Sequence, residues 1–275
     1  MLVLAAVFAA GALTATLVLC REDAAALILR WMTRTTTTAA GHNERYGTRH
    51  RVLNTTAPTT TWLNMGLWDG DDEKDEDKKH DENAFVRANE RMAAAIARLG
   101  RWTSRETLLD VGYGCGDQDV YWWTHCRPKA IVGVTIEASQ QAIAARKVNE
   151  MGLADDIRLH VGDATLLDKV LPVQSKVDVV VALDTAYHFN TRRAFVKQAY
   201  ERLNPGGRIV MADIILGPNA TRAGWWKVRL LSLMGGMPLD NLVQRDEYEA
   251  RLGAQGFTDI EVCFFLSSKI FFFFF

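Results

Sequence analysis

The chain has 275 residues, a formal net charge of −1 and 24% charged side chains. This length suffices for one large domain with a full core, or for a domain with attached segments. A charge so close to zero creates no global field for nucleic acid, whose enzymes need a basic face. The four cysteines form no Cys-x-x-Cys pair and no zinc-type Cys/His spacing, which favours a reduced intracellular protein.

Residues 1–20 carry no charged side chain, and about 20 such residues cross the hydrocarbon core of a bilayer. A cleaved signal peptide would need a basic start and a shorter apolar core, and a buried core helix is the other alternative. We expect a single-pass transmembrane anchor. Six arginines follow within residues 21–51 and no basic residue precedes the span, so the positive-inside rule places the bulk of the protein in the cytosol.

Two polar segments precede or interrupt the main domain. Residues 21–61, which become rich in threonine from residue 33, predict a linker between the anchor and a domain over 62–275. Residues 69–83, DGDDEKDEDKKHDEN, predict a solvated charged loop. This run lacks the spaced ligands and the turn glycine of a calcium loop, so a metal site is the less favoured interpretation.

From residue 84 onward, segments with helical spacing alternate with segments typical of buried strands. The expected helices cover 84–100, 138–152, 191–203 and 245–257, and a further helix begins near Asp117. The expected strands cover 107–112, 131–136, 157–164, 177–184 and 208–216, with a turn at 204–207 and one or two closing strands after residue 258. The alternation predicts a Rossmann-like α/β domain with a doubly wound, mostly parallel seven-stranded sheet.

The stretch LLDVGYGCGDQ, residues 108–118, places three glycines at alternate positions directly after the first strand. Ligands of open parallel sheets bind at this edge, and Gly112, Gly114 and Gly116 let a ligand touch bare backbone. A dinucleotide loop would have the spacing Gly-x-Gly-x-x-Gly and would leave the helix start to a phosphate, where this chain has Asp117. The acids around the loop favour a ligand that carries positive charge.

The segment LLDVGYGCGD resembles motif I of the class I S-adenosylmethionine-dependent methyltransferases. The resemblance continues in order through VGVTIEASQ, VGDA, VALDTAYHF and LNPGGRIVMAD, and it covers residues 62–262. It implies methyl transfer with S-adenosylmethionine as the cofactor. By this resemblance Gly112, Gly114 and Gly116 lie against the methionine part and ribose of the cofactor. Asp110 would then hold the loop and the amino group.

Many members of that family carry an acid at the end of the second strand, where this chain has Thr135. GVTIEASQ resembles instead the Gly-x-Thr-x-Ser-x-x-Gln variant of cyclopropane fatty acid synthases, tocopherol methyltransferases and some sugar O-methyltransferases, with a glutamate in place of the serine. The resemblance assigns the ribose contacts to Thr135, Ile136 and Gln140. It places Asp163 and Ala164 beside the adenine, although Asp163 also suits a simple turn after a strand.

NMGLW, residues 64–68, resembles a segment that covers the cofactor in small-molecule methyltransferases. Trp68 would then lie near the sulfonium, where an aromatic ring favours a cation, or it is a plain core tryptophan. A methyltransferase supplies mainly orientation and exclusion of water, and a base where the acceptor arrives protonated. In DTAYHF we interpret His188 as the candidate base and Tyr187 as the residue that positions the acceptor; a histidine bonded only to loop backbone is the alternative.

Residues 217–243 lie between the fifth strand and the late helix, where this branch of the family carries a lid over the acceptor. Tryptophans, leucines and a methionine stand there with Lys227 and Arg229, which suits a pocket wall, an interfacial helix or core packing. With the anchor, the lid favours a small, lipophilic acceptor methylated on O, N or C, with no metal and no nucleic acid involved. Cyclopropane formation or C-methylation of a lipid chain, and a non-catalytic cofactor-binding relic, remain alternatives. The acceptor, the oligomeric state and the C-terminal FFFFF stay open.

Overall fold

The computed structural model describes residues 36–37, 43–44, 60–68, 83–217, 225–263, 265–267 and 270–273. The chain divides into two compact units, Met1–Arg45 and Tyr46–Phe275. In the first unit, β1 (Thr36–Thr37) and β2 (Asn43–Glu44) pair in antiparallel fashion. The predicted anchor over 1–20 lies outside the described residues. Within the described ranges, no helix has both the length and the apolar character that a bilayer crossing requires.

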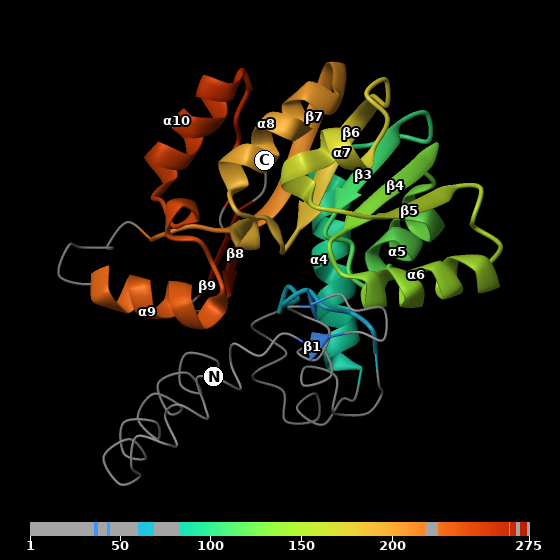
Figure 1. The fold of residues 1–275 in the computed structure, drawn as a ribbon, viewed down its shortest axis with the longest axis horizontal. Helices are drawn as coiled ribbons and strands as arrows, with labels where there is room; N and C mark the ends of the chain where they lie inside the picture. Colours follow the sequence, from blue (N-terminus) through green and yellow to red (C-terminus); the bar gives the residue numbers. More distant parts are fainter. Residues whose placement is uncertain are drawn as a thin grey trace, which may run out of the picture. The chain divides into compact units, whose positions relative to one another are not determined.

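Five parallel strands form the body of the sheet in the second unit (Figure 1). Their order is β5 (Ile157–Val161), β4 (Ala130–Thr135), β3 (Thr107–Val111), β6 (Val177–Leu183) and β7 (Leu203–Ile214). All four pairings between these strands are parallel. The chain runs from β3 through β4 to β5 and then returns to β6 on the other side of β3. This reversal confirms the predicted Rossmann-like parallel sheet for five strands and creates a switch point between β3 and β6.

Helices cover both faces of this sheet (Figure 1). The helices α4 (Ala84–Gly100), α5 (Asp117–Cys126) and α6 (Ala138–Glu150) pack on one face, and α7 (Leu167–Val170), α8 (Arg192–Arg202) and α10 (Arg245–Gln255) on the other. Consecutive strand residues alternate between the two cores: Leu108 faces α4 and α5, whereas Leu109 faces α8. Because side chains of a strand point alternately to its two faces, a strand buried on both faces reads as a continuous apolar run.

The predicted helix over 84–100 is confirmed at both ends, and the other predicted helices are confirmed with small differences at their ends. The turn expected at 204–207 is wrong, because these residues belong to the start of β7. The ladder passes from the pair Val177–Leu203 to the pair Val179–Arg208, so the residues between bulge out of it. Gly206, with φ +78°, provides the local bend that suggested a turn.

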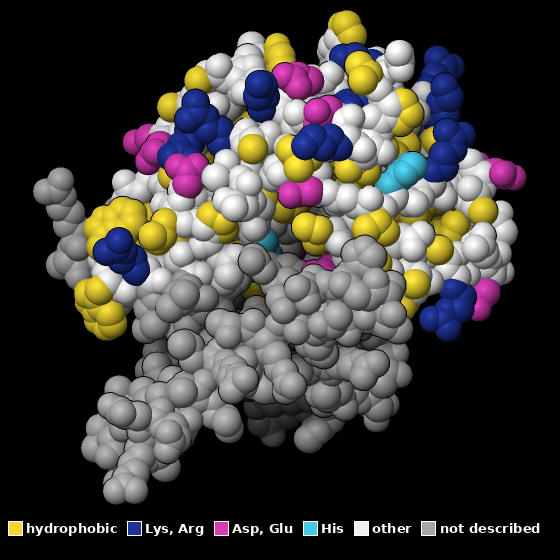
Figure 2. All heavy atoms as spheres, viewed as in Figure 1, with side chains coloured by type: hydrophobic (Ala, Val, Ile, Leu, Met, Phe, Trp, Pro, Cys, Tyr) yellow, Lys and Arg dark blue, Asp and Glu magenta, His cyan; other side chains and the backbone are white. Residues whose placement is uncertain are grey.

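Beyond β7 the backbone pairing continues with two short antiparallel strands. β9 (Ile270–Phe273) pairs with β7, and β8 (Phe265–Ser267) pairs with β9. The predicted lid contains α9 (Trp225–Gly235) and the short helix η5 (Leu239–Asn241). Hydrophobic and basic side chains lie together over α9 (Figure 2), where Trp225 and Trp226 are 44% and 62% exposed.

A buried polar network joins α8 to β7, α10 and η5. Arg192 donates from Nη1 to Oδ2 of Asp213 over 2.7 Å, and Asp213 is fully buried. Tyr248 donates its hydroxyl to the same oxygen over 2.8 Å, and the Arg192 guanidinium lies 4.3 Å from the centre of the Tyr248 ring. Asn241 accepts from the backbone N–H of Arg192 over 2.9 Å. The network fixes the elements that carry the lid against the sheet.

Replacing Arg192 with alanine leaves the Asp213 carboxylate buried without its cation. We expect the free energy of unfolding to fall by about 3–5 kcal/mol, as for other buried pairs that lose one partner. Arg245→Ala is the matched control, because Arg245 pairs with Glu249 on the surface, where such pairs contribute about 0.2–1 kcal/mol. Urea denaturation followed by circular dichroism measures both variants. Equal losses would show that the buried pair does not hold α8 to β7.

Candidate active site

The loops that follow β3 and β6 touch each other at the switch point. Gly112 has φ +76°, and a Cβ atom built on it would lie only 2.3 Å from Oγ1 of Thr185. Its backbone N–H donates to the carbonyl of Val134 over 2.7 Å, which holds the turn against β4. A side chain at this position would therefore both strain the backbone and push the two loops apart. The close approach of the loops after β3 and β6 therefore requires a residue without a side chain at position 112.

The other two glycines of the loop allow close packing of two further segments. A Cβ atom on Gly114 would lie 2.9 Å from Cδ1 of Leu63, which belongs to the N-terminal cover, the segment of residues 60–68. A Cβ atom on Gly116 would lie 2.8 Å from Cβ of Ala144 in α6. The three predicted glycines thus bring the β6 loop, the N-terminal cover and α6 around one short loop.

Two carboxyl groups lie beneath this loop with no exposed surface. Asp110 of β3 accepts from Nε2 of Gln118 over 2.6 Å, while its other oxygen and both oxygens of Asp119 accept no hydrogen bond from the described residues. Burial raises the pKa of Asp110 to about 7. Burial, and then the charge of Asp110, raise the pKa of Asp119 well above its ordinary value. Asp119 was not predicted from the sequence, because no motif marks it.

The predicted ribose contacts come together at the carboxyl end of β4. Thr135 and Gln140 are both buried, and the Thr135 hydroxyl donates to Oε1 of Gln140 over 3.2 Å. Between them along the chain, Ile136 is 60% exposed, so its side chain is available to a ligand and takes no part in the core. Glu137, which replaces the usual serine, is buried directly before α6.

The predicted adenine contacts lie at the end of β5. Oδ1 of Asp163 accepts from the backbone N–H and from the hydroxyl of Thr165, each over 2.8 Å. Asp163 therefore caps the short helix η2 (Ala164–Leu166), which is the turn role that the sequence also allowed. Ala164 is buried at the first position of η2.

The N-terminal cover is bonded to four segments around the site: the loop after β6, α4, α5 and α6. The backbone N–H of Met65 donates to Oδ2 of Asp184 over 2.6 Å, and that of Leu67 donates to the carbonyl of Ala88 in α4 over 2.7 Å. At the other end of the cover, the Thr61 hydroxyl lies 2.6 Å from Asp117. Lys147 of α6 completes this contact: it lies 2.8 Å from the Thr61 hydroxyl and forms an ion pair with Asp117 at 2.6 Å. The cover is therefore held against the glycine loop from both sides.

Trp68 ends this cover and lies beside α4. Its indole N–H donates to the carbonyl of Met65 over 2.8 Å, and its ring lies 6.4 Å from that of Phe85, centre to centre. These contacts hold the part-buried Trp68 at the end of the cover beside α4, and its predicted place near the sulfonium stays a prediction.

The DTAYHF segment forms a compact group after β6. Asp184 is part-buried with φ +58°, and it accepts from the Tyr187 hydroxyl over 2.8 Å as well as from Met65. Burial raises the pKa of Asp184 to about 7. The rings of Tyr187 and His188 lie 4.2 Å apart within η3 (Ala186–His188). Sequence reasoning missed Asp184, because its raised pKa depends on packing by residues remote in the chain.

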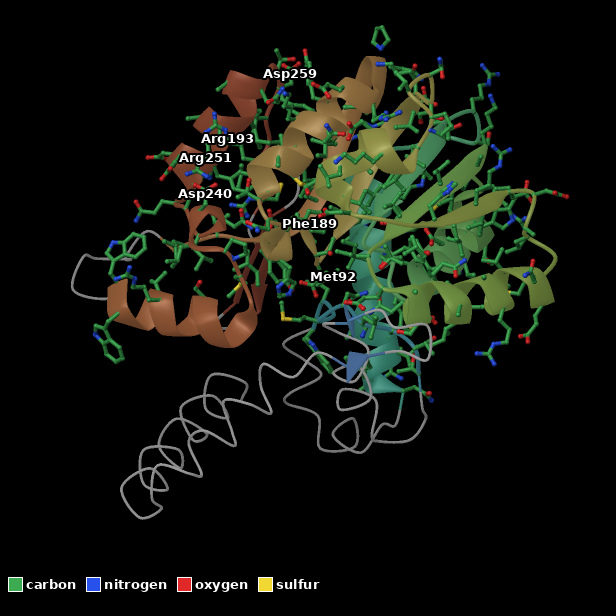
Figure 3. All side chains as sticks on the ribbon, in the orientation of Figure 1. Met92, Phe189, Arg193, Asp240, Arg251 and Asp259 are labelled. Carbon is green, nitrogen blue, oxygen red and sulfur yellow. The ribbon has the colours of Figure 1, made fainter. Side chains whose placement is uncertain are left out.

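His188 contacts the lid through its ring. Nδ1 lies 3.4 Å from the carbonyl of Gly236, and in the neutral ring Nδ1 would donate to it. That tautomer leaves the lone pair on Nε2, the arrangement that a general base requires. Asn241 of η5 supports the segment by donating to the carbonyls of Tyr187 and Phe189 over 3.0 and 2.7 Å. Phe189, labelled in Figure 3, packs edge-on against Phe195 of α8.

These features define a class of domain. It has a doubly wound sheet, a glycine loop at the switch point, two buried acids next to that loop, and the DTAYHF segment after β6. A family model described as a methyltransferase domain matches residues 82–262, more than half of the chain. The chain therefore belongs to this family, and the resemblance to class I S-adenosylmethionine-dependent methyltransferases is confirmed. The glycine loop and the two buried acids, Asp110 and Asp119, fit a cofactor that carries a positively charged sulfonium and an ammonium group.

Two named relatives and one solved structure are similar to this chain. The chain is 31% identical to erythromycin 3''-O-methyltransferase of Saccharopolyspora erythraea, over 73% of this chain and 63% of that protein. It is 28% identical to 27-O-demethylrifamycin SV methyltransferase of Amycolatopsis mediterranei, over 70% and 65% of the two chains. The matches thus span less than two thirds of these relatives. The solved structure of the 4+2 cyclase SpnF shares the fold, with a TM-score of 0.62, 20% identity and coverage of 80% and 72%.

Gly112→Ala tests the contact between the two loops. We expect it to lower the free energy of unfolding by about 2–5 kcal/mol, the sum of left-handed strain and overpacking against Thr185. Gly206→Ala is the matched control, because φ is nearly the same, +78°, but nothing lies within 4 Å of its Cβ position. It should cost about 1–2 kcal/mol, from strain alone. Urea denaturation measures the free energy of unfolding of both variants. Equal decreases would show that contact with Thr185 does not add to the cost at position 112.

The raised pKa of Asp184 predicts how stability depends on pH. The folded protein keeps this proton up to about pH 7, whereas an unfolded aspartate loses it near pH 4. The folded state thus binds more protons between these values, and the free energy of unfolding should fall as pH rises through this window. Asp184→Asn should make that fall shallower, measured by denaturation at pH 5, 6 and 8. An unchanged slope would contradict the raised pKa.

Proposed function

We propose that this protein transfers the methyl group of S-adenosylmethionine to a hydroxyl oxygen of a small, lipophilic molecule. The glycine cradle at the switch point, with buried acids beneath it, is the observation that carries the proposal. Oxygen is favoured over nitrogen and carbon because the names of both relatives specify O-methylation. Methylation of carbon, including cyclopropane formation on a lipid chain, is the alternative transfer.

The site residues divide the binding work by region. Gly112, Gly114 and Gly116 would bring backbone against the methionine part of the cofactor, and Asp110 would act on its amino group. Thr135, Ile136 and Gln140, grouped at the end of β4, would contact the ribose. Asp163 and Ala164 would border the adenine, and the N-terminal cover that ends in Trp68 would close over the crevice. When bound, the cofactor supplies an electrophilic methyl group on its sulfonium.

The segment after β6 would handle the acceptor. Tyr187, held by Asp184, would position the acceptor hydroxyl, and His188 would take its proton at Nε2. The acceptor oxygen would then bond to the methyl carbon while the carbon–sulfur bond breaks and its electron pair stays on sulfur. Orientation and exclusion of water supply most of the acceleration in such a displacement.

We further propose the organisation predicted from the sequence, with an anchor over 1–20, a linker over 21–61 and a seven-stranded domain over 62–275. Support for the anchor is its apolar composition and the arginines that follow it, which favour a cytosolic catalytic domain. The exposed tryptophans of α9, within the lid over 217–243, support a lipophilic acceptor that arrives from a membrane.

A transfer assay tests the function. The full chain in detergent is incubated with methyl-labelled S-adenosylmethionine and a panel of hydroxylated small molecules that includes O-demethylated erythromycin and rifamycin derivatives, after the names of the two relatives. We expect label in at least one product, and His188→Ala should lower kcat by about 100-fold or more. Tyr187→Phe should mainly raise KM for the acceptor, because its ring remains but its hydroxyl is lost.

His125→Ala is the matched control, since His125 also contacts a backbone carbonyl through Nδ1 but lies exposed on α5. It should leave kcat within about twofold, as exposed substitutions remote from a site usually do. A folded protein that binds the cofactor and transfers to none of the panel or to lipid extracts would favour the relic. Failure to bind the cofactor would overturn the proposal.

A further inference from the structure

The binding scheme above gives Asp110 a role at the amino group of the cofactor but leaves its buried neighbour Asp119 without one. Both side chains are fully buried, Asp110 in β3 and Asp119 in the first turn of α5, and they interact directly with each other. Gln118 supplies one donor, to Oδ2 of Asp110. The three remaining carboxyl oxygens accept no hydrogen bond from the described residues. Buried polar atoms without partners are rare enough in native proteins that such a group requires a physical reason.

The charged and titratable groups around the pair do not neutralise it. Lys147 of α6 attracts Asp119, but it lies in an ion pair with Asp117 at 2.6 Å. Asp117 itself, from the same turn of α5, adds a like charge. The Tyr113 phenol of the glycine loop is the other titratable neighbour, and burial followed by the charges of the two acids raises its pKa, so it stays neutral.

Two adjacent acids in a dry site do not both ionise near neutral pH. One shared proton turns their contact into a hydrogen bond and lowers the charge of the pair from −2 to −1. A positive charge brought to the glycine loop would supply the missing neutralisation from outside. The loop suits this, because Asp110 lies in the strand directly before it and Asp119 lies in the first turn of the helix directly after it.

We propose that Asp110 and Asp119 form a one-proton pair that senses the charge of the cofactor, releasing its proton when the cationic methyl donor binds. This inference rests on the proposed function. Methyl transfer removes the sulfonium charge and leaves a neutral thioether, so the pair takes a proton back at the product stage. The site therefore prefers S-adenosylmethionine to S-adenosylhomocysteine by electrostatics, and product release is favoured by reprotonation.

Calorimetry of the full chain tests this without knowledge of the acceptor. S-adenosylmethionine and S-adenosylhomocysteine are titrated at pH 6, 7 and 8 in phosphate and in Tris, whose ionisation enthalpies differ, which yields the protons released per ligand. We expect a proton release near pH 7 that is larger for S-adenosylmethionine. Its affinity should rise with pH, with about tenfold per pH unit as the limit for one proton.

Asp119→Asn is the decisive variant, because the amide has the shape of the acid and donates to Asp110 permanently. We expect it to fold, to bind S-adenosylmethionine without releasing a proton, and to lose about tenfold of its preference over S-adenosylhomocysteine. Asp117→Asn is the matched control in the same turn. It should keep the release at a lower pH, because Asp117 raises the pKa of Asp119.

The outcomes separate this inference from the proposed function. No binding of S-adenosylmethionine by the folded wild type overturns both. Binding without proton release overturns only the pair. If proton release persists in Asp119→Asn but disappears in Asp184→Asn, the proton comes from Asp184, and the proposal for the Asp110–Asp119 pair is also overturned.

Discussion

The close approach of the β3 and β6 loops is the constraint on which the site depends. The chain leaves β3 toward α5 on one face of the sheet and leaves β6 toward α8 on the other, so a crevice opens between the two connections, and Gly112 against Thr185 leaves no room for a side chain there. The N-terminal cover contacts the same place through Asp184 and Gly114. The crevice therefore results from the sheet topology, and glycines are required in the loop because side chains there would clash with the neighbouring segments.

That geometry has an electrostatic consequence. Asp110, Asp119 and Asp184 all come from segments that end or begin at the crevice, and packing takes the first two fully and the third partly out of water, so their pKa values rise. Each raised pKa weakens the fold at neutral pH relative to a surface acid. Buried networks elsewhere, such as Arg192 with Asp213, pair each acid with a cation. The acids that lower the stability of the fold thus lie at the crevice, where a positively charged ligand can stabilise them.

How far the sequence predicts this structure depends on whether a feature is local. The helix over 84–100 and the buried strands follow from side-chain spacing, and the glycine loop follows from backbone needs within a few residues. Asp119 and Asp184 were missed because burial by segments distant in the chain gives them their properties. The turn at 204–207 failed for a related reason: pairing with β6 absorbs Gly206 into a bulged strand, which local turn signals do not reveal.

The fold alone does not decide the reaction, since a 4+2 cyclase shares it at a TM-score of 0.62. The reaction is decided by groups that respond to what changes during turnover. A reaction that leaves the charge of a bound ligand unaltered gains nothing from a titratable pair beneath it. Methyl transfer from a sulfonium removes one positive charge from the crevice, and Asp110 with Asp119 is built to exchange one proton. That match between the charge lost and the proton gained links this acid pair to methyl donation more closely than the fold does.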